Sequence, residues 1–183
     1  MKRIKQLKSE IIHNDPYCRI RKDLVEYPSG FQSDYHVIDR NNFVAIIPIT
    51  ENNEIYLVKQ FRYPVSSFSL EFPMGAIEKD ERKEEAAARE LREETGIVAG
   101  KIDFLGAISP AHGALSNTAY CYVATEIKEI NDPEPDESEC LELHKIELDK
   151  FDELIVSKEI FDGPTIFAKY LLDMYHKKAN NIS

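Results

Sequence analysis

An acid-crowded helix in the middle of the chain constrains its structure more than any other feature. Helix-forming residues run from about Glu81, and Gly96 ends the run with a residue suited to a left-handed cap. Three carboxylates, those of Glu90, Glu93 and Glu94, fall near the last turn, where the negative end of the helix dipole disfavours acids. Such a helix favours a bound cation.

The spacing of these acids suits a hard divalent ion. Glu90 and Glu94 are one turn apart, so both can reach one ion or an adjacent pair, and magnesium prefers oxygen ligands of this kind. Arg89 precedes Glu93 by four residues and can hold its carboxylate through a charge-assisted hydrogen bond. Composition alone also fits an ordinary surface helix rich in Glu and Arg, so a wider pattern has to decide.

That wider pattern is G-x5-E-x7-R-E-U-x-E-E-x-G-U, where U is a bulky aliphatic residue. The chain matches its nine specified positions with Gly75, Glu81, Arg89, Glu90, Leu91, Glu93, Glu94, Gly96 and Ile97. The stretch resembles the signature of the Nudix hydrolases. The resemblance implies an α/β fold, an α/β/α sandwich with a mixed sheet. It also implies hydrolysis of a nucleoside diphosphate linked to another group, with Mg²⁺ or Mn²⁺ as cofactor.

Length, charge and cysteine usage limit the other possibilities. A chain of 183 residues makes one domain, or one domain with an extension. The net charge of −10 argues against nonspecific nucleic-acid binding, and no apolar run approaches the length that spans a bilayer. The basic N-terminus lacks an apolar signal core, and Cys18, Cys121 and Cys140 lack the pairing of a zinc site. We therefore expect a cytoplasmic protein with free thiols, and neither nucleic acid nor a membrane as partner.

Residues 1–41 are expected to form an N-terminal antiparallel β extension, and residues 42–183 the catalytic domain. Residues 1–14 are polar and predict a loose or marginally helical lead-in. Strand patterns at 17–27 and 33–39, separated by Pro-Ser-Gly, predict a hairpin. Two strands are marginal alone, so the hairpin should pack on the core or on a second subunit. Many ADP-ribose pyrophosphatase-like Nudix proteins carry such a segment and use it to dimerise, and this resemblance implies a homodimer.

The rest of the sequence reads as strands and helices of an α/β domain. A short helix is predicted from Asp149 to about Ser157, and an amphipathic helix from Gly163 with Ile166, Tyr170 and Met174 packed on the core. Strands are predicted at 43–49, 55–61, 68–72, 101–109, 117–125 and 140–148.

An acidic, proline-containing loop at 131–139 precedes the last predicted strand. Loops of this composition are often merely solvated. This one also resembles the glutamate-rich loop of ADP-ribose pyrophosphatases, in which one glutamate is the general base and a neighbour holds metal. On that resemblance Glu137 is the expected base and Glu139 a metal ligand, with Glu134, Asp136 and Glu142 as alternatives.

The resemblance also assigns roles around the helix. In the family the carbonyl before the motif's first glycine is a metal ligand, and here this is the carbonyl of Met74, which joins Glu90 and Glu94. Arg89 and Glu93 belong to the expected catalytic group, and Glu93 is open between metal ligand, outer anchor and base. The charge at Glu81 suits the start of the helix, where it should cap the helix and brace the preceding loop.

Two charged residues before the helix are expected to bind substrate. The segment 60–64 resembles the Q-x-R segment of ADP-ribose hydrolases, and the Arg62 guanidinium can grip a phosphate with two hydrogen bonds. The alternative is a strand-edge arginine in a surface ion pair. Glu71 resembles the glutamate before the family's helix-entry loop and either contacts substrate or braces that loop. His112, a loop histidine without an evident partner, is left out of the catalytic group.

These features predict Mg²⁺-dependent hydrolysis of a nucleoside diphosphate sugar, first of all ADP-ribose, to AMP and ribose 5-phosphate. GDP-mannose or another sugar nucleotide is an alternative, because segment 109–114 departs from the glycine-rich loop of the ADP-ribose group. A sensor that binds a nucleotide without catalysis is a second alternative, although three intact carboxylates argue against it. Cleansing of oxidised nucleoside triphosphates is disfavoured by the N-terminal extension and by the Arg62 segment.

Overall fold

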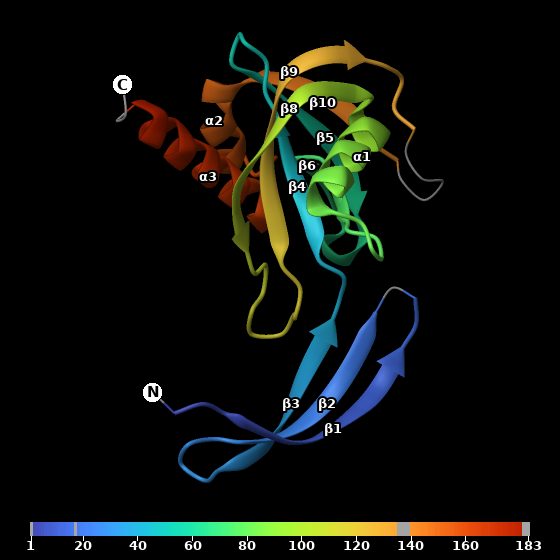
Figure 1. Ribbon diagram of the computed structural model, residues 1–183, viewed down its shortest axis with the longest axis vertical. Helices are drawn as coiled ribbons and strands as arrows, with labels where there is room; N and C mark the ends of the chain where they lie inside the picture. Colours follow the sequence, from blue (N-terminus) through green and yellow to red (C-terminus); the bar gives the residue numbers. More distant parts are fainter. Residues whose placement is uncertain (1, 17, 135–139, 181–183) are drawn as a thin grey trace. The chain divides into compact units, whose positions relative to one another are not determined.

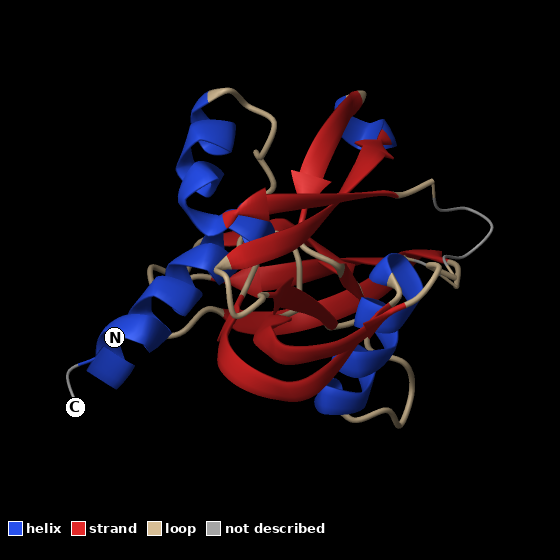
Figure 2. Cartoon of the chain, turned by 90° about the horizontal axis from the view of Figure 1, so that it is seen from above, coloured by secondary structure: helices blue, strands red, loops and turns tan. Residues whose placement is uncertain are grey.

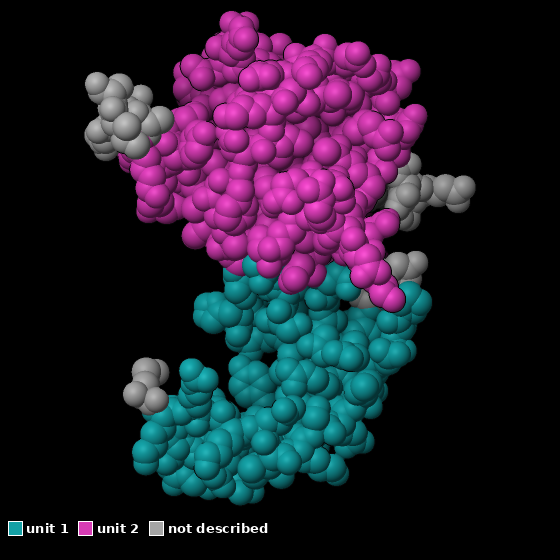
Figure 3. Space-filling view, viewed as in Figure 1, with its two compact units in different colours: residues 1–41, 109–118 teal, residues 42–108, 119–183 magenta. Residues whose placement is uncertain are grey.

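The computed structural model describes residues 2–16, 18–134 and 140–180. For residues 179 and 180 it describes the backbone alone. The chain divides into two units, one of residues 1–41 and 109–118, the other of residues 42–108 and 119–183 (Figure 3). The first unit thus includes a segment, 109–118, that the sequence division had placed in the catalytic domain.

The first unit is a three-stranded antiparallel sheet in the order β1-β2-β3, formed by β1 (Lys5–Asn14), β2 (Arg19–Glu26) and β3 (Gln32–Asp39). The prediction of a loose or helical lead-in at 1–14 is therefore wrong. Strand β1 is exposed along its whole length, so no alternation of apolar and polar residues marked it. Its pairing with β2 along the backbone ladder, reinforced by the Ser9 hydroxyl donating to Asp23 at 2.6 Å, holds it instead.

Segment 109–118 packs on this sheet through main-chain and side-chain hydrogen bonds. The Ile38 N–H donates to the carbonyl of Ala114 at 2.9 Å, and the Tyr35 hydroxyl donates to the carbonyl of Gly113 at 2.7 Å. These contacts account for the membership of this segment in the first unit, far as it lies from residues 1–41 in sequence.

The second unit contains two sheets, shown in Figure 1. One is antiparallel, in the order β10-β5-β6, and the other is mixed, in the order β7-β4-β9-β8, with β4 and β9 parallel. The strands are β4 (Phe43–Pro48), β5 (Glu54–Arg62), β6 (Ser67–Glu71), β7 (Met74–Ala76), β8 (Ile97–Ile108), β9 (Ala119–Ile130) and β10 (Glu142–Glu147).

Three α-helices flank these strands: α1 (Lys83–Thr95), α2 (Phe151–Val156) and α3 (Gly163–Asn180). Short 3₁₀ turns, η1 (Tyr63–Val65) and η2 (Leu148–Lys150), join β5 to β6 and β10 to α2. Helix α1 lies on one side of the strands, and α2 and α3 lie on the other (Figures 1 and 2). This layering confirms the predicted α/β/α sandwich. No helix in the described ranges is both long and apolar enough to cross a bilayer.

Strand β4 shows how the layers are held together. Its side chains alternate between two faces, as a strand requires. Val44 and Ile46 pack in a cluster with Ala87 and Leu91 of α1. Ala45 and Ile47 pack in a second cluster, whose α3 members are Ala168 and Leu172. A continuous apolar strand is therefore buried on both sides, between helices.

The buried stripe of α3 differs in part from the predicted one, although Ile166 packs against the core as predicted. Tyr170 and Met174 are exposed, whereas Thr165, Ala168 and Leu172 are fully buried. Both stripes recur at helical spacing, so periodicity alone did not choose between them. The smaller residues allow the helix to approach the sheet closely.

Helix α1, which carries the acids of the motif, begins two residues later than expected. Helix α1 starts at Lys83, and Glu84 and Glu85 occupy its first turn, so Glu81 precedes the helix. Gly96 adopts φ of 70° as the left-handed C-cap, which confirms the predicted stop. A Cβ there would lie 1.9 Å from the carbonyl oxygen of Asn131, so both conformation and space require glycine.

The packing of α3 predicts a stability change for Leu172→Ala. This substitution removes a fully buried side chain from the cluster between β4 and α3. The free energy of unfolding, measured by urea denaturation, should fall by about 2–5 kcal/mol, because neighbouring side chains fill only part of the space that the leucine leaves. Lys177→Ala, at an exposed position of the same helix, is the control and should change it by less than about 0.5 kcal/mol. Equal effects of the two substitutions would contradict the packing.

Candidate active site

The last turns of α1 lie against the loop that enters the helix. Glu90 is 9% exposed and Glu94 is 3% exposed. The N–H of Met74 donates to Oε2 of Glu94 at 3.0 Å. A Cβ on Gly75 would lie 2.1 Å from the carboxyl carbon of Glu90, so only glycine leaves room for that carboxylate. The structure therefore brings the two carboxylates to the same short strand, β7.

Arg89 organises the acids around it. Its guanidinium donates from Nε to Glu81 at 2.8 Å, and from Nη1 to Glu90 at 2.7 Å and Glu93 at 3.0 Å. Nη2 donates to the carbonyl of Ala76 at 2.9 Å. The hydrogen bond with Glu81 is the largest cause of a raised pKa of Arg89, and it holds the pKa of the Glu81 carboxyl below its usual value. Arg89 thus fixes side chains of the site and the main chain of the loop together.

Glu81 links the loop to this network. Besides accepting from Arg89, its carboxylate accepts the N–H of Glu78 at 2.9 Å. The expected bracing of the loop is therefore present as geometry, although Glu81 stands outside the first turn of the helix.

Arg62 and Glu71 meet on the hairpin of β5 and β6. The Nε of Arg62 donates to both carboxylate oxygens of Glu71 at 3.1 Å, and Nη2 donates to Oε2. Glu71 is 1% exposed, whereas the side chain of Arg62 is 41% exposed. Arg62 is therefore in an ion pair, as the alternative reading held, but the pair is buried at its acidic end.

The surroundings of Arg62 connect this ion pair to α1. Burial lowers the pKa of Arg62, but the hydrogen bond and charge of Glu71 outweigh it, and the charges of Asp162 and Glu94 raise it further. The pKa of Arg62 accordingly stands above its usual value. Arg62 and Glu71 thus belong to the same electrostatic environment as the acids of the helix.

Three residues of this environment escaped the sequence analysis as site residues. Gln60 donates from Nε2 to Glu71 at 3.3 Å, and Ser69 is directly opposite Gln60 in the β5–β6 ladder. Asp162 caps α3 by accepting the N–H of Thr165 at 2.8 Å. The sequence did offer a signal for two of them. Residues two apart in a strand share a face, so Gln60 lies on the face of Arg62, and Ser69 lies on the face of Glu71.

The acidic loop approaches α1 at its first described residues. The N–H of Asn131 donates to the carbonyl of Gly96 at 2.8 Å, and the N–H of Glu134 donates to the carbonyl of Glu93 at 2.8 Å. The expected base Glu137 and ligand Glu139 lie outside the described residues, as does Asp136. Glu142 begins β10 opposite Lys59, and His112 belongs to segment 109–118 of the first unit.

The oxygen donors near β7 fit a hard divalent cation. Five carboxylates, those of Glu71, Glu81, Glu90, Glu93 and Glu94, stand against three guanidiniums, those of Arg62, Arg89 and Arg92, the last 3.6 Å from Glu93. Among the described residues, no three His, Cys, Asp or Glu side chains form a ready-made metal cluster. Any ion would therefore combine the two buried carboxylates with a main-chain carbonyl or a further acid, and all these donors are the hard oxygens that Mg²⁺ and Mn²⁺ accept.

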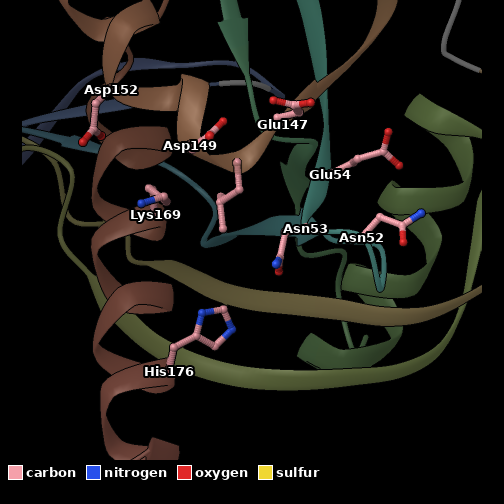
Figure 4. Close-up of a pocket in the computed structure, with 9 residues that line it drawn as sticks. Asn52, Asn53, Glu54, Glu147, Asp149, Asp152, Lys169 and His176 are labelled. Carbon is pink, nitrogen blue, oxygen red and sulfur yellow. The ribbon is translucent and has the colours of Figure 1, made fainter.

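A cavity of about 650 Å³ lies elsewhere in the second unit (Figure 4). It is lined by Asn52, Asn53, Glu54, Glu147, Leu148, Asp149, Asp152, Lys169 and His176. None of the residues proposed from the sequence is among them, and its partly buried lysine, Lys169, is already paired with Asp173 at 2.9 Å. Size alone therefore does not locate the site.

Two family models match the chain. The NUDIX domain matches residues 40–166, and the nucleoside diphosphate sugar hydrolase N-terminal domain matches residues 4–38.

Curated relatives and a solved structure agree with these matches. An ADP-ribose pyrophosphatase of Bacillus subtilis is 32% identical over 151 residues, 82% of each chain. A methanol dehydrogenase activator of Bacillus methanolicus is 32% identical over 171 residues, 93% of this chain and 92% of that protein. The fold matches a crystal structure of an ADP compounds hydrolase with a TM-score of 0.85 and 23% identity, covering 98% of this chain and 97% of the other. The chain therefore belongs to the Nudix hydrolase family.

Proposed function

We propose that this Nudix hydrolase cleaves the diphosphate linkage of a nucleoside diphosphate sugar, with ADP-ribose as substrate and AMP and ribose 5-phosphate as products. The observation that carries the proposal is the meeting of Glu90 and Glu94 at β7, beside the Arg62–Glu71 pair. The name of the Bacillus subtilis relative, and the N-terminal match to nucleoside diphosphate sugar hydrolases, support this substrate class.

Nudix hydrolases generally use divalent cations, and we propose Mg²⁺ or Mn²⁺ here. Glu90, Glu94 and the carbonyl of Met74 would hold the metal, with Glu139 as a further ligand from the acidic loop. A divalent ion there supplies neutralising charge for the diphosphate and lowers the pKa of a bound water.

The remaining roles belong to side chains of this chain. Arg62, which Glu71 holds in the ligand-free structure, binds a phosphate of the substrate through its partly exposed guanidinium. Arg89 keeps Glu90 and Glu93 in place. Glu137 takes the proton from the attacking water, and Glu93 is the substitute base. The contact of Glu134 with the carbonyl of Glu93 supports an acidic loop that reaches this end of α1.

A substrate panel tests the proposal. Purified protein with Mg²⁺ is offered ADP-ribose, GDP-mannose, NADH and deoxynucleoside triphosphates, and products are resolved by chromatography. We expect AMP and ribose 5-phosphate from ADP-ribose. Preferential cleavage of GDP-mannose would move the assignment to another sugar nucleotide, and turnover of none would favour a nucleotide sensor.

We further propose that residues 1–41 mediate a homodimer of a cytoplasmic enzyme. The exposed strand β1 and its N-terminal flank carry the exposed aliphatic side chains Ile4, Leu7, Ile11 and Ile12, which a second subunit can cover. The three cysteines are free thiols, as in a reducing compartment.

Glu94→Gln should reduce turnover of ADP-ribose by two or more orders of magnitude. The substitution removes a ligand charge, whereas the amide oxygen can still accept the N–H of Met74, so the melting temperature should change little. Glu85→Gln, an exposed acid in the first turn of the same helix, is the control and should retain activity. Full activity of Glu94→Gln would remove the metal assignment.

Gly75→Ala should raise the Mg²⁺ concentration needed for half-maximal activity by about tenfold or more. The added methyl would overlap the Glu90 carboxylate and force it away from β7. Gly163→Ala is a matched control, because a Cβ there meets no described atom within 4 Å. An unchanged Mg²⁺ dependence in Gly75→Ala would place the ion away from Glu90.

Sedimentation at micromolar concentration should give twice the mass of the chain. Ile11→Asp puts a charge on the exposed strand β1 and should shift the protein towards monomer, while Glu10→Gln beside it should not. A monomeric wild-type protein would contradict the proposed role of residues 1–41.

A further inference from the structure

Ser69 carries a buried hydroxyl that the described residues leave without a hydrogen-bond partner. Its residue is 1% exposed, and Oγ has no partner in the described part of the chain. Buried polar groups are nearly always hydrogen-bonded, and an unpaired one destabilises a folded protein. This hydroxyl therefore requires an explanation.

The strand register places Ser69 beside the Arg62–Glu71 pair. Ser69 is opposite Gln60, Arg62 is opposite Ser67, and Glu71 follows Ser69 by two residues, so these side chains share one face of the hairpin. The amide of Gln60 reaches Glu71 from the position opposite Ser69. On this face of the hairpin, the carboxylate of Glu71 therefore lies towards Ser69.

The two halves of the ion pair differ in their freedom to move. The carboxylate of Glu71 is held in the interior, whereas the guanidinium of Arg62 is partly in solvent. An anion that draws Arg62 outward takes N–H donors from a carboxylate that cannot follow. A buried carboxylate that loses its donors is strongly destabilised.

We propose that Ser69 is a positioning residue that donates its hydroxyl hydrogen to Glu71 when Arg62 turns to a bound diphosphate. The inference rests on the proposed function, in that it needs an anionic substrate at Arg62. In the free protein Arg62 and Gln60 supply the donors of Glu71. In the complex Ser69 replaces those that Arg62 withdraws. Ser69 does not touch the substrate; it lowers the free energy of the arrangement in which Arg62 does.

The change in melting temperature caused by Ser69→Ala distinguishes this positioning role from a purely structural one. Removing an unpaired hydroxyl should leave the melting temperature of the free protein unchanged or higher. The KM for ADP-ribose should rise about fivefold, the equivalent of one hydrogen bond, with kcat within about twofold. Ser69→Thr retains a hydroxyl and should restore KM. Ser157→Ala, which removes a hydrogen-bonded hydroxyl after α2, should leave KM unchanged.

The remaining outcomes overturn the inference. An unchanged KM in Ser69→Ala does so, and so does a fall in melting temperature or a failure to fold, since either would show a hydroxyl already bonded in the free protein. If the wild-type protein hydrolyses no nucleotide sugar, the proposed function fails, and calorimetry with inorganic pyrophosphate then tests Ser69 separately. Weaker binding by Ser69→Ala supports the inference; equal binding, or no binding by the wild-type protein, overturns it.

Discussion

Repulsion between carboxylates at the end of one helix is the constraint on which the rest of this structure depends. Glu90, Glu93 and Glu94 sit where the helix dipole is least favourable to them. Arg89 offsets part of that repulsion by contacting two of them and the carbonyl of Ala76 at the end of β7. Among the described residues, the three guanidiniums of Arg62, Arg89 and Arg92 do not neutralise these three carboxylates together with those of Glu71 and Glu81, so the arrangement favours an added divalent cation.

The fold supplies the rigid supports that such crowding needs. Strand β4 holds α1 on one face and α3 on the other, and it pairs with β7, whose Met74 and Gly75 meet the acids. The Phe72 N–H just before β7 donates to Thr165 of α3 at 3.2 Å. The carboxylates are thus fixed against a strand that both helical layers hold in position, and a metal site requires fixed ligands of this kind.

The helix and its motif were predictable because their signals are local. The spacing of Glu90 and Glu94, and the cap at Gly96, follow from helix geometry and from the glycine backbone. Strand β1 was not predictable in this way, since a strand exposed on both faces has no hydrophobic period. The buried face of α3 was misassigned at Tyr170 and Met174, because Thr165, Ala168 and Leu172 fit a second stripe at helical spacing and only tertiary packing chooses between the two stripes. The partners of Glu71 depended on strand register, which the sequence alone did not supply.

A crystal soaked with Mn²⁺ and a non-hydrolysable analogue of ADP-ribose tests the central claim most directly. Anomalous scattering should show at least one ion bound to the carboxylates of Glu90 and Glu94 and to the carbonyl of Met74, in contact with the diphosphate. Density for the analogue without an ion at these residues, with Arg89 still holding Glu90, would contradict the account.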